Sequence, residues 1–519
     1  MPSPSACAVA ALLACPALGN PTRSLLNRGA MEADTPKASQ VQDVFRTAWN
    51  GYYEHAFPHD TLLPLTGGNY DDRNAWGVTP IDSLSTAIIM EESDIVNQIL
   101  KYAATIDFTT TKEVNSSISL FETNIRYLGG LLAGYDLLTG PMKNLVNDTN
   151  TTLVDALLKQ ATTLADSLSI AFDTPSGVPD DAVFLNPTRR IGGSASNGPA
   201  GFGTLVLEWT RLSDLTGNKT YAQLAQKAQE YLVKPKGKPE PFPGLIGYTV
   251  SIADGTFQDQ SGGWGGGTDS FYEYLIKMYL YDPKEFSFYK DRWVAAADST
   301  IEHLASHPTT RSDLTFLAGY NGQTINHWSG HCPVASFAGG NFILAGVVLN
   351  EPKYTDFGLA LATSYYETYK QTPARIGPEG FQWVAADGGS PPNGGDQADF
   401  YQKAGFWSFS GGYILRPETI ESLYYAYRVT GDNKYRDMVW EAFTAVRDLC
   451  RAKYGFAGIR DVMKKDGGGQ DNFQQSFFLA ETLKYAYLTF AGDSAVQFHG
   501  KGGNEFVFNT EAHPFRVRR

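Results

Sequence analysis

Residues 508–514 read FNTEAHP, a short segment dense in oxygen atoms of the kind that bind hard cations. Ca2+ prefers hydroxyl, carbonyl and carboxylate oxygens, and one threonine offers both a side-chain hydroxyl and a backbone carbonyl. Thr510 is therefore a candidate metal ligand. The alternative interpretation is a terminal strand over 505–508 that ends before Pro514, because short motifs often match by chance. Zinc is not indicated, since paired Cys ligands and a His-Glu-x-x-His spacing are both missing, and His513 is interpreted as structural.

Two acidic residues stand near the start of predicted helices. Glu122 is followed four residues later by Arg126, so both side chains lie on the same side of a helix. The pair indicates either a buried structural ion pair or a reactive acid held by an arginine. Asp269 follows three glycines and Thr268, and we expect it to cap a helix that begins near Ser270, because Asp is a preferred N-cap residue.

Three further acids have unusual surroundings. Glu418 follows Pro417 in a predicted first helical turn, where the helix dipole favours a negative charge whatever its role. Glu421 lies one turn later and shares that face. Glu481 is surrounded by aromatic residues, which requires a reason such as a partly buried ion pair with Lys484. A carboxylic acid and a carboxylate placed on either side of a glycosidic bond can hydrolyse it.

Six ordered stretches between about residue 40 and the end form a recognisable series. They are GVTPIDSL (77–84), FETNIRYLGGLL (121–132), TDSFYEYL (268–275), LRPETIESL (415–423), SFFLAETLKY (476–485) and FNTEAHP (508–514). The series resembles glycoside hydrolase family 47, the class I α-1,2-mannosidases that trim N-glycans. The resemblance implies an all-α fold, an (α/α)7 barrel of helix hairpins, with a C-terminal β-hairpin over 505–515 that enters the barrel as a plug and carries Thr510.

The resemblance also implies an activity and a role for each matching residue. The expected enzyme is an inverting, exo-acting mannosyl-oligosaccharide 1,2-α-mannosidase (EC 3.2.1.113) that uses Ca2+ held by Thr510. Glu122 is expected to protonate the leaving oxygen through a water, Glu418 to activate the attacking water, and Asp269 to be the third essential carboxylate, as an acid or as a water-positioning group. The expected substrate-binding residues are Arg126, Glu208, Glu379, Arg416, Glu421, Glu481 and Glu511.

The chain departs from the family pattern at several positions. Ser85 replaces the second Asp of an Asp-x-Leu-Asp pattern, and Gln475 replaces a Glu. Ser336 and Tyr365 occupy the places of two cysteines that the family usually bridges, so the usual disulfide is not expected. Gly267 stands where members with narrow specificity carry an arginine, and we expect it to leave room for several glycan branches.

Helix pairs recur along the chain. After Pro417, apolar residues at the i, i+3, i+4, i+7 spacing predict one helix, and a second follows a break at 430–435. Similar breaks occur at 139–141, 216–221, 282–284 and 351–354. Each pair is one unit whose apolar face needs a neighbour, which fits either an open solenoid or a closed toroid. The family resemblance favours the closed form.

Composition limits the partners. The net charge of -13, with no run of Lys or Arg, argues against nucleic acid or an anionic membrane surface and suits a neutral glycan. The apolar run 6–18 is too short to span a membrane and reads as a signal-peptide core. The expected organisation is a signal peptide at 1–19, a linker at 20–40, one catalytic domain at 41–515 and a tail at 516–519, in a monomer.

Four Asn-x-Ser/Thr sites also favour a secretory route; they are at Asn115, Asn147, Asn150 and Asn218. Secretion is the first expectation for localisation, and the Golgi lumen is the second. Only Cys332 and Cys450 remain after the predicted signal peptide, and two cysteines do not make a disulfide framework. Two other functions stay open: a lectin-like relative that binds mannose without turnover, and another helical-barrel glycosidase with a different linkage preference.

Overall fold

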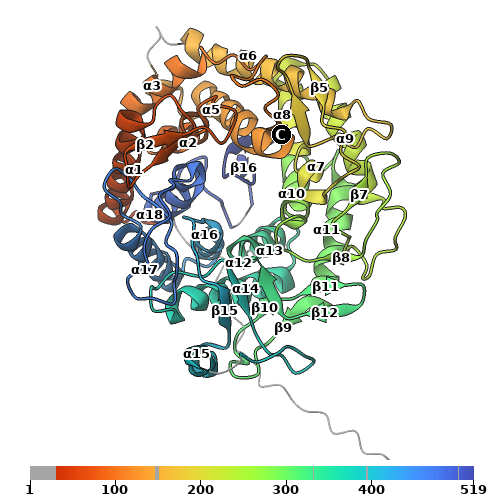
Figure 1. Cartoon of the computed structure of the whole chain (residues 1–519), viewed down its shortest axis with the longest axis vertical. Coiled ribbons are helices and arrows are strands. Elements are labelled where there is room, and N and C mark those ends of the chain that lie inside the picture. The colour runs from red at the N-terminus through yellow and green to blue at the C-terminus, as the bar shows by residue number, and fades with distance from the viewer. Residues whose placement is uncertain (1–30, 147–150, 331, 393–394, 501, 519) are drawn as a thin grey trace, which may run out of the picture.

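The computed structural model describes residues 31–146, 151–330, 332–392, 395–500 and 502–518. In these ranges the long helices form a ring around the C-terminal strands (Figure 1). The predicted signal peptide at 1–19, the sites Asn147 and Asn150, and the side chain of Cys332 lie outside the part of the chain that is described. The first helix begins at Thr35, within the segment predicted to be a linker.

Helices of the ring pack as pairs, in which one helix is buried along most of its length and its partner is buried on one face. A helix that is apolar all round belongs inside, and an amphipathic one outside. The buried helices of the described chain are α2 (Val78–Ile89), α5 (Gly129–Thr139), α8 (Val206–Thr216), α10 (Asp269–Tyr281), α13 (Phe337–Val348), α16 (Glu418–Thr430) and α18 (Leu483–Phe490). Their partners are α3 (Ser93–Ala103), α6 (Thr151–Leu168), α9 (Thr220–Val233), α11 (Ser287–Ser299), α14 (Pro352–Gln371), α17 (Asn433–Leu449) and α1 (Thr35–His55).

The ring is closed by its two ends. Helix α1 packs against α18, the last helix of the chain, rather than against the helix that follows it in sequence. The backbone N–H of Asp34 donates to the carbonyl of Phe490 at 2.8 Å, which ties the segment before α1 to the end of α18. The helix pairs therefore form a closed toroid and not an open solenoid.

The predicted turns between paired helices are present. Gly217 and Gly431 adopt left-handed backbone angles, φ of 74° and 60°, directly after α8 and α16. Glycine takes this conformation without a steric penalty, which is why it ends helices so often. Asp432 then accepts a hydrogen bond from the Lys434 N–H at 3.0 Å and caps α17. The helix hairpin predicted after Pro417 is confirmed, and the residues of its first face are buried: Ile420, Leu423, Tyr424 and Tyr427.

Short helices and irregular turns connect the ring. The short helices are α4 (Leu120–Thr123), α7 (Pro199–Gly203), α12 (Cys332–Ala335) and α15 (Asp396–Ala404). The π-helical turns are Asn124–Leu128, Thr300–Leu304 and Phe478–Thr482, and the 3-10 turns are Lys143–Leu145 and Ser169–Phe172. The sequence pattern did not predict the π turns.

Small antiparallel sheets of two or three strands lie at the ends of the helices. The strands are β1 (Thr61–Leu63), β2 (Gly68–Tyr70), β3 (Ile118–Ser119), β4 (Ala182–Phe184), β5 (Arg190–Ile191), β6 (Ser196–Asn197), β7 (Val250–Ser251), β8 (Ser261–Gly262), β9 (Ala305–Ser306), β10 (Phe316–Leu317), β11 (Gly319–Asn321), β12 (Thr324–Asn326), β13 (Trp328–Gly330), β14 (Gly380–Gln382), β15 (Trp407–Ser410), β16 (Phe506–Phe508) and β17 (Pro514–Arg516).

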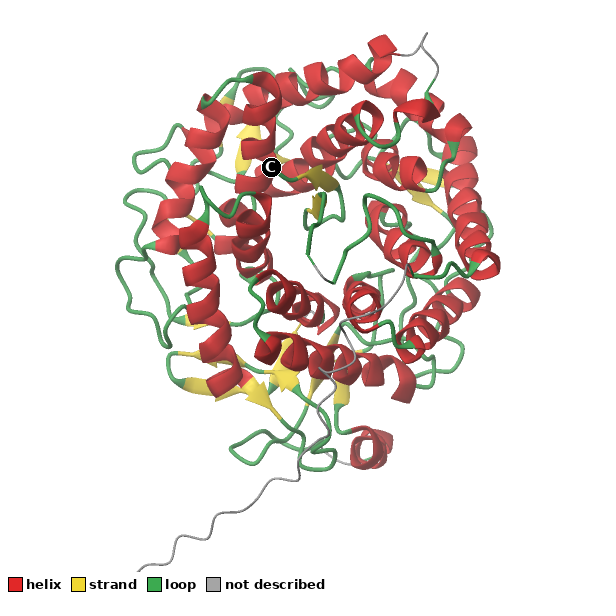
Figure 2. Ribbon diagram, turned by 180° about the vertical axis from the view of Figure 1, so that it is seen from behind, coloured by secondary structure: helices red, strands yellow, loops and turns green. Residues whose placement is uncertain are grey.

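The C-terminal hairpin lies in the middle of the ring, as Figure 2 shows from behind. Its strands β16 and β17 pair in antiparallel register, with Val507 opposite Phe515. Strand β16 packs against α10 and β17 against α5, and the N–H of Arg516 donates to Asp136 of α5 at 3.0 Å. The predicted β-hairpin plug is therefore present.

No helix of the described residues is long and apolar enough to span a bilayer.

Replacing Phe515 by alanine tests how much the plug contributes to stability. Phe515 is completely buried, so Phe515→Ala is expected to lower the free energy of unfolding by about 3–5 kcal/mol in a denaturant titration. The adjacent Arg516 is exposed, and Arg516→Ala is expected to cost less than about 0.5 kcal/mol. Equal, small losses in both variants would show that the hairpin is not part of the cooperative fold.

Candidate active site

A cavity of about 170 Å³ opens where several inner helices begin and the C-terminal hairpin turns. Within the described ranges, seven carboxylates and two guanidinium groups line it. The acids are Glu122, Asp269, Glu273, Glu418, Glu421, Glu481 and Glu511, and the cations are Arg126 and Arg416. Thr510 lines the same cavity. The structure thus brings together all three predicted catalytic carboxylates, the predicted metal ligand and most of the predicted binding residues.

The three predicted catalytic acids differ in their protonation. Burial raises the pKa of the Asp269 carboxyl to about 7 and that of Glu418 to about 7. Burial also acts to raise the pKa of Glu122, but the charges of Arg126 and Arg73 outweigh it and hold that pKa below its ordinary value. Near neutral pH, Glu122 is therefore ionised, whereas Asp269 and Glu418 are partly protonated.

Asp269 and Glu418 each begin an inner helix. Asp269 is the first residue of α10, while Thr268 is the N-cap, so the prediction that Asp269 caps the helix is wrong. The reason is that Asp269 already has helical geometry, and the Thr268 hydroxyl is used to donate to the Gly263 carbonyl at 2.6 Å. Glu418 lies in the first turn of α16, as predicted; it is the first residue of that helix, and Pro417 is the N-cap. Both carboxylates therefore lie at the positive end of a helix dipole.

Arg126 joins three acids from distant parts of the chain. Its Nε lies 2.7 Å from Glu122, and its Nη1 lies 2.9 Å from Glu511 and 3.5 Å from Asp82. The pair Glu122–Arg126 predicted from the i, i+4 spacing is confirmed. Arg126 lies within the π turn Asn124–Leu128 and lines the cavity. Turns of this kind are often found at functional sites.

Arg416, the second arginine of the cavity, also contacts two acids. Its Nε lies 3.1 Å from both carboxylate oxygens of Glu379, and its Nη1 lies 3.6 Å from Glu418. Leu415, directly before it, has a φ of 70°, a conformation that costs free energy for a branched residue. Its carbonyl accepts a hydrogen bond from Thr482 at 2.7 Å, which stabilises this backbone.

Two predicted substrate-binding residues do not line the cavity. Glu379 lies behind Arg416, and Glu208 is fully buried behind the hairpin turn. Glu208 accepts hydrogen bonds from Tyr274 at 2.6 Å and from Asn509 at 2.9 Å. Burial raises its pKa to about 7. Glu379 thus contacts Arg416, and Glu208 contacts the hairpin turn that carries Thr510.

Glu481 and Lys484 do not form the ion pair that the sequence suggested. The Lys484 amino group donates to Ser85 at 2.8 Å and to the Ala512 carbonyl, and burial lowers its pKa to about 7. Glu481 lies in the π turn Phe478–Thr482 and interacts with Glu511; burial and that neighbouring acid raise its pKa well above the ordinary value. Glu481 and Glu511 therefore share a proton, or they need a nearby cation that offsets their two charges.

The hairpin turn is held by a network beneath the cavity. Asn509 accepts hydrogen bonds from the N–H groups of Glu511 and His513 and donates to the Ile125 carbonyl at 3.0 Å. Burial lowers the pKa of His513 to about 4, so its neutral ring bridges Ser85 at 2.9 Å and Asp82 at 3.0 Å. His513 is structural, as predicted, and Ser85, which departs from the family pattern, is its partner.

Sequence reasoning did not single out Asp82, Glu273 or Lys277. Asp82 is completely buried in α2, and Glu273 pairs with Lys277 inside α10. A signal was present for each: an acid within an otherwise apolar helix, and an i, i+4 pair on a helix that is apolar on every side. Lys277 also donates to the Asn509 carbonyl at 3.2 Å, so it supports the same hairpin turn.

The residues around Thr510 are suited to a hard cation. Among the described residues, neither the hydroxyl nor the carbonyl of Thr510 takes part in a hydrogen bond, and one oxygen each of Glu418 and Glu511 is buried without a partner. An excess of buried carboxylates is stabilised by a divalent cation. Within the described ranges no group of three or more His, Cys, Asp and Glu side chains forms a ready-made metal site. A cation here would depend on the Thr510 oxygens, with water or ligand oxygens to complete the shell.

Ser336 and Tyr365, which stand where the family usually has two bridged cysteines, form other contacts. Ser336 is buried at the start of α13 and its hydroxyl lies 2.9 Å from that of Thr419, while Tyr365 packs edge-on against Phe316. Cys450 is buried and free, and burial raises the pKa of its thiol. Ser336 thus joins the start of α13 to α16 by a hydrogen bond, and Tyr365 joins α14 to β10 by aromatic packing. These are the two positions at which the usual disulfide of the family is not expected.

Comparison with known proteins identifies the relatives of this chain. The family model described as glycosyl hydrolase family 47 matches residues 44–517. A mannosyl-oligosaccharide alpha-1,2-mannosidase 1B of Aspergillus phoenicis is 53% identical over 482 residues, which cover 93% of this chain and 91% of the relative. A mannosyl-oligosaccharide alpha-1,2-mannosidase of Penicillium citrinum is 52% identical, with 95% and 94% covered.

A solved structure, the alpha-1,2-mannosidase from Trichoderma reesei, superimposes with a TM-score of 0.92. It is 59% identical in sequence, and the match covers 94% of this chain and 100% of that one. These matches confirm the resemblance drawn from the six motifs, and they confirm the predicted (α/α)7 barrel.

Replacing Arg126 by methionine tests the charge network at the centre of the site. The substitution keeps an unbranched side chain but leaves Glu122, Glu511 and Asp82 without their common cation. Breaking a buried pair in this way costs about 3–5 kcal/mol of unfolding free energy, measured by denaturant titration. Arg46, on the surface of α1, pairs with Asp43 and Glu92, and Arg46→Met is expected to cost less than about 1 kcal/mol. A loss below about 1 kcal/mol for Arg126→Met would contradict this interpretation.

Proposed function

The chain belongs to glycosyl hydrolase family 47, and from this membership we propose that it is an exo-acting mannosyl-oligosaccharide α-1,2-mannosidase. It removes terminal α-1,2-linked mannose from high-mannose N-glycans. The observation that carries the proposal is that Glu122, Asp269 and Glu418 line one cavity, in a chain 53% identical over most of its length to a protein named for this activity.

We propose that the reaction inverts the configuration of the anomeric carbon. Glu418, in its ionised form, accepts a proton from a water that attacks this carbon on the face opposite the leaving group. The bond between the anomeric carbon and the glycosidic oxygen breaks, and the leaving oxygen receives a proton. Inverting glycosidases keep their two carboxyl groups about 6.5–9.5 Å apart so that this water fits between them. The products are free mannose and a glycan that is one residue shorter.

The proton for the leaving oxygen is assigned to a water held by Glu122. Because Arg126 and Arg73 hold the pKa of Glu122 low, this carboxylate binds and orients the water rather than storing a proton. Asp269, whose pKa burial raises to about 7, lines the same cavity, and we propose it as the acid that supplies this proton. The roles of the two acids thus differ because one faces two arginines and the other is buried with another carboxylate, Glu273, beside it.

Ca2+ is proposed as the cofactor, with Thr510 as its protein ligand. When bound, the cation would attract the vicinal hydroxyl groups of a terminal mannose and offset the charge of the surrounding carboxylates. The support from this chain is the pair of free Thr510 oxygens, taken over the described residues, and the unpartnered carboxylate oxygens of Glu418 and Glu511. Arg126, Arg416, Glu421, Glu481 and Glu511 remain the proposed residues for contacts with the sugar.

Gly267 supports activity on several branches of the glycan. Its φ of 102° favours glycine, and a Cβ at this position would lie 3.1 Å from the ring of Tyr248. A side chain at this position would therefore press on the ring of Tyr248. Glycine adds no side-chain atoms at this position, and we propose that more than one α-1,2-linked mannose is removed.

The proposed location is the secretory pathway, with secretion first and the Golgi lumen second. Asn115 and Asn218, the two glycosylation sites that fall within the described residues, are both exposed. An exposed asparagine in this motif can accept a glycan in that compartment.

The proposed partners are high-mannose N-glycans, free or on glycoproteins, and the protein is proposed to act as a monomer.

Replacing Thr510 by valine tests the metal site without an activity assay. Valine keeps the shape of threonine and removes the hydroxyl. Ca2+ at 100 times its dissociation constant is expected to stabilise the wild type by about 2.7 kcal/mol, measured as a shift in thermal unfolding. Thr510→Val is expected to need at least about ten-fold more Ca2+ for the same shift. Thr163→Val, on outer helix α6, is the control and should behave as the wild type does. An unchanged Ca2+ response in Thr510→Val would remove Thr510 from the metal site.

Mannose release from a nine-mannose N-glycan, followed by mass, tests the proposed function. Wild type with Ca2+ is expected to remove several α-1,2-linked residues, and a chelator is expected to abolish release. Glu418→Gln should lower the rate by at least about 1000-fold, because water activation is lost. Glu54→Gln, whose side chain is 71% exposed on α1, is the matched control and should leave the rate unchanged. Glycan binding without any release would instead support the lectin-like alternative, and release of other linkages would support a different glycosidase.

A further inference from the structure

A second cavity lies beside the catalytic one, and the proposed reaction does not use it. Its volume is about 270 Å³. The glycine run 262–266 lines it, and the same loop leads directly into Asp269 of the catalytic cavity. Helix α12 also borders both, since Ala335 lines the second cavity and Val334 lines the catalytic one. The two cavities are therefore neighbours.

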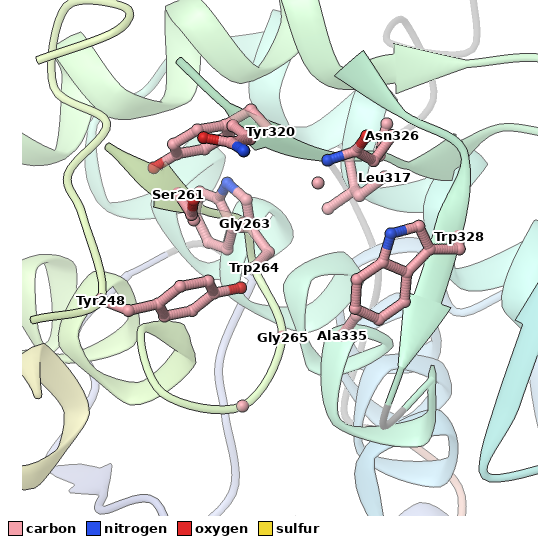
Figure 3. Close-up of a pocket in the computed structure, with 15 residues that line it drawn as sticks. Tyr248, Ser261, Gly263, Trp264, Gly265, Leu317, Tyr320, Asn326, Trp328 and Ala335 are labelled. Carbon is pink, nitrogen blue, oxygen red and sulfur yellow. The ribbon is translucent and has the colours of Figure 1, made fainter. Parts of the chain in front are cut away.

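Aromatic side chains form both the floor and the rim of the second cavity. Trp264 and Tyr320 are only 1% and 2% exposed and form the floor, whereas Tyr248 and Trp328 are 36% and 51% exposed. Figure 3 shows Tyr248 and Trp328 on opposite sides of the opening, with the Tyr248 hydroxyl directed toward the middle. A ligand that enters the cavity therefore passes between the rings of Tyr248 and Trp328.

The floor is held rigidly by residues behind it. Trp264 stacks on Tyr272 with ring centres 4.9 Å apart, and its Nε1 donates to the Thr300 hydroxyl at 2.8 Å. The Tyr320 hydroxyl donates to the Ile246 carbonyl at 2.7 Å. A cavity fixed in this way does not have to be ordered when a ligand binds, which favours affinity.

Polar groups at the rim are available to a ligand. In the described chain, no hydrogen bond uses the side-chain amides of Asn321 or Asn326, and Figure 3 shows Asn326 beside Leu317 at the cavity. A Cβ added at Gly263 would meet nothing nearer than 3.5 Å, so packing does not require glycine there. The lack of a side chain at Gly263 instead leaves the backbone open to close approach by a ligand.

The lining chemistry indicates a neutral, polar ligand with apolar faces. Among the residues that the structure describes, no Asp, Glu, Lys or Arg lines the second cavity, in contrast to the seven acids of its neighbour. A pyranose ring presents C–H groups on its faces, which pack on aromatic rings, and hydroxyls at its edge, which bond to amides. A charged or phosphorylated ligand would find no counter-charge here.

We propose that the second cavity is a glycan subsite that holds a further mannose residue of the same N-glycan while the terminal mannose occupies the catalytic cavity. The inference rests on the proposed function and deepens it. The catalytic cavity is small and charged, so the rest of a branched glycan lies outside it, and the neighbouring cavity offers uncharged surface next to it. Tyr248 and Trp328 hold the residue between them.

The test compares two substrates. A nine-mannose N-glycan is long enough to reach both cavities, whereas α-1,2-mannobiose has only one residue beyond the scissile bond. For the double variant Tyr248→Ala/Trp328→Ala, the ratio of kcat/KM for the glycan to kcat/KM for mannobiose is expected to fall about ten-fold, mainly through KM. Phe288→Ala, a 42% exposed aromatic on outer helix α11, is the control and should keep the wild-type ratio.

A second variant fills the cavity instead of removing its rim. Gly263→Leu places a side chain in the open space and is expected to lower the same ratio, again through KM. In a Glu418→Gln background, calorimetry should show weaker binding of the nine-mannose glycan for both variants, by about ten-fold. An unchanged ratio and unchanged glycan binding in correctly folded variants would overturn the subsite.

A wrong subsite and a wrong mannosidase activity give different experimental results. If wild type releases mannose from both substrates and the ratio is unaffected by the substitutions, the subsite is wrong and the mannosidase stands. If wild type releases no mannose from either substrate, the proposed activity is wrong, and the subsite inference fails as a part of it. Equal losses for the two substrates would mean that Tyr248 and Trp328 only support the fold of the catalytic cavity.

Discussion

An excess of buried carboxylates at the centre of the helical ring is the constraint on which the rest of the structure depends. Seven acids and two arginines line a cavity of about 170 Å³, where uncompensated charge is costly. Arg126 and Arg416 each bridge acids from different parts of the chain, and burial raises the pKa values of Glu421 and Glu511 to about 8. This incomplete compensation is the physical basis for the cation and the proton transfer proposed above.

The C-terminal hairpin makes this arrangement possible. The ring closes when α1 packs on α18, but its centre is complete only when residues 506–516 enter. The turn of the hairpin carries Thr510 and Glu511 to the cavity, while Asn509 and His513 fix the turn to the inner helices from below. A terminal segment thus becomes part of the active centre, and stability and chemistry depend on the same contacts.

Much of this could be predicted from the sequence. Glycine and proline breaks located the helix hairpins, and six motifs located the acids of the cavity. Three features could not be read in this way. The π turns at Arg126 and Glu481 depend on tertiary packing, since periodicity there is still helical. Lys484 bonds to Ser85 and Ala512 rather than to Glu481, because the hairpin arrives from 28 residues later in the chain. The aromatic cavity of Tyr248 and Trp328 joins loops about 80 residues apart, which no local pattern connects.

The stereochemistry of the first product tests the central claim most directly. Proton NMR, recorded in the first minutes of hydrolysis of an α-1,2-linked mannoside, distinguishes the two anomers of the released mannose before they equilibrate. A water activated by Glu418 and attacking opposite the leaving oxygen gives β-mannose first. Release of α-mannose first would mean that a carboxylate attacks the sugar directly, which would contradict the roles assigned to Glu122, Asp269 and Glu418.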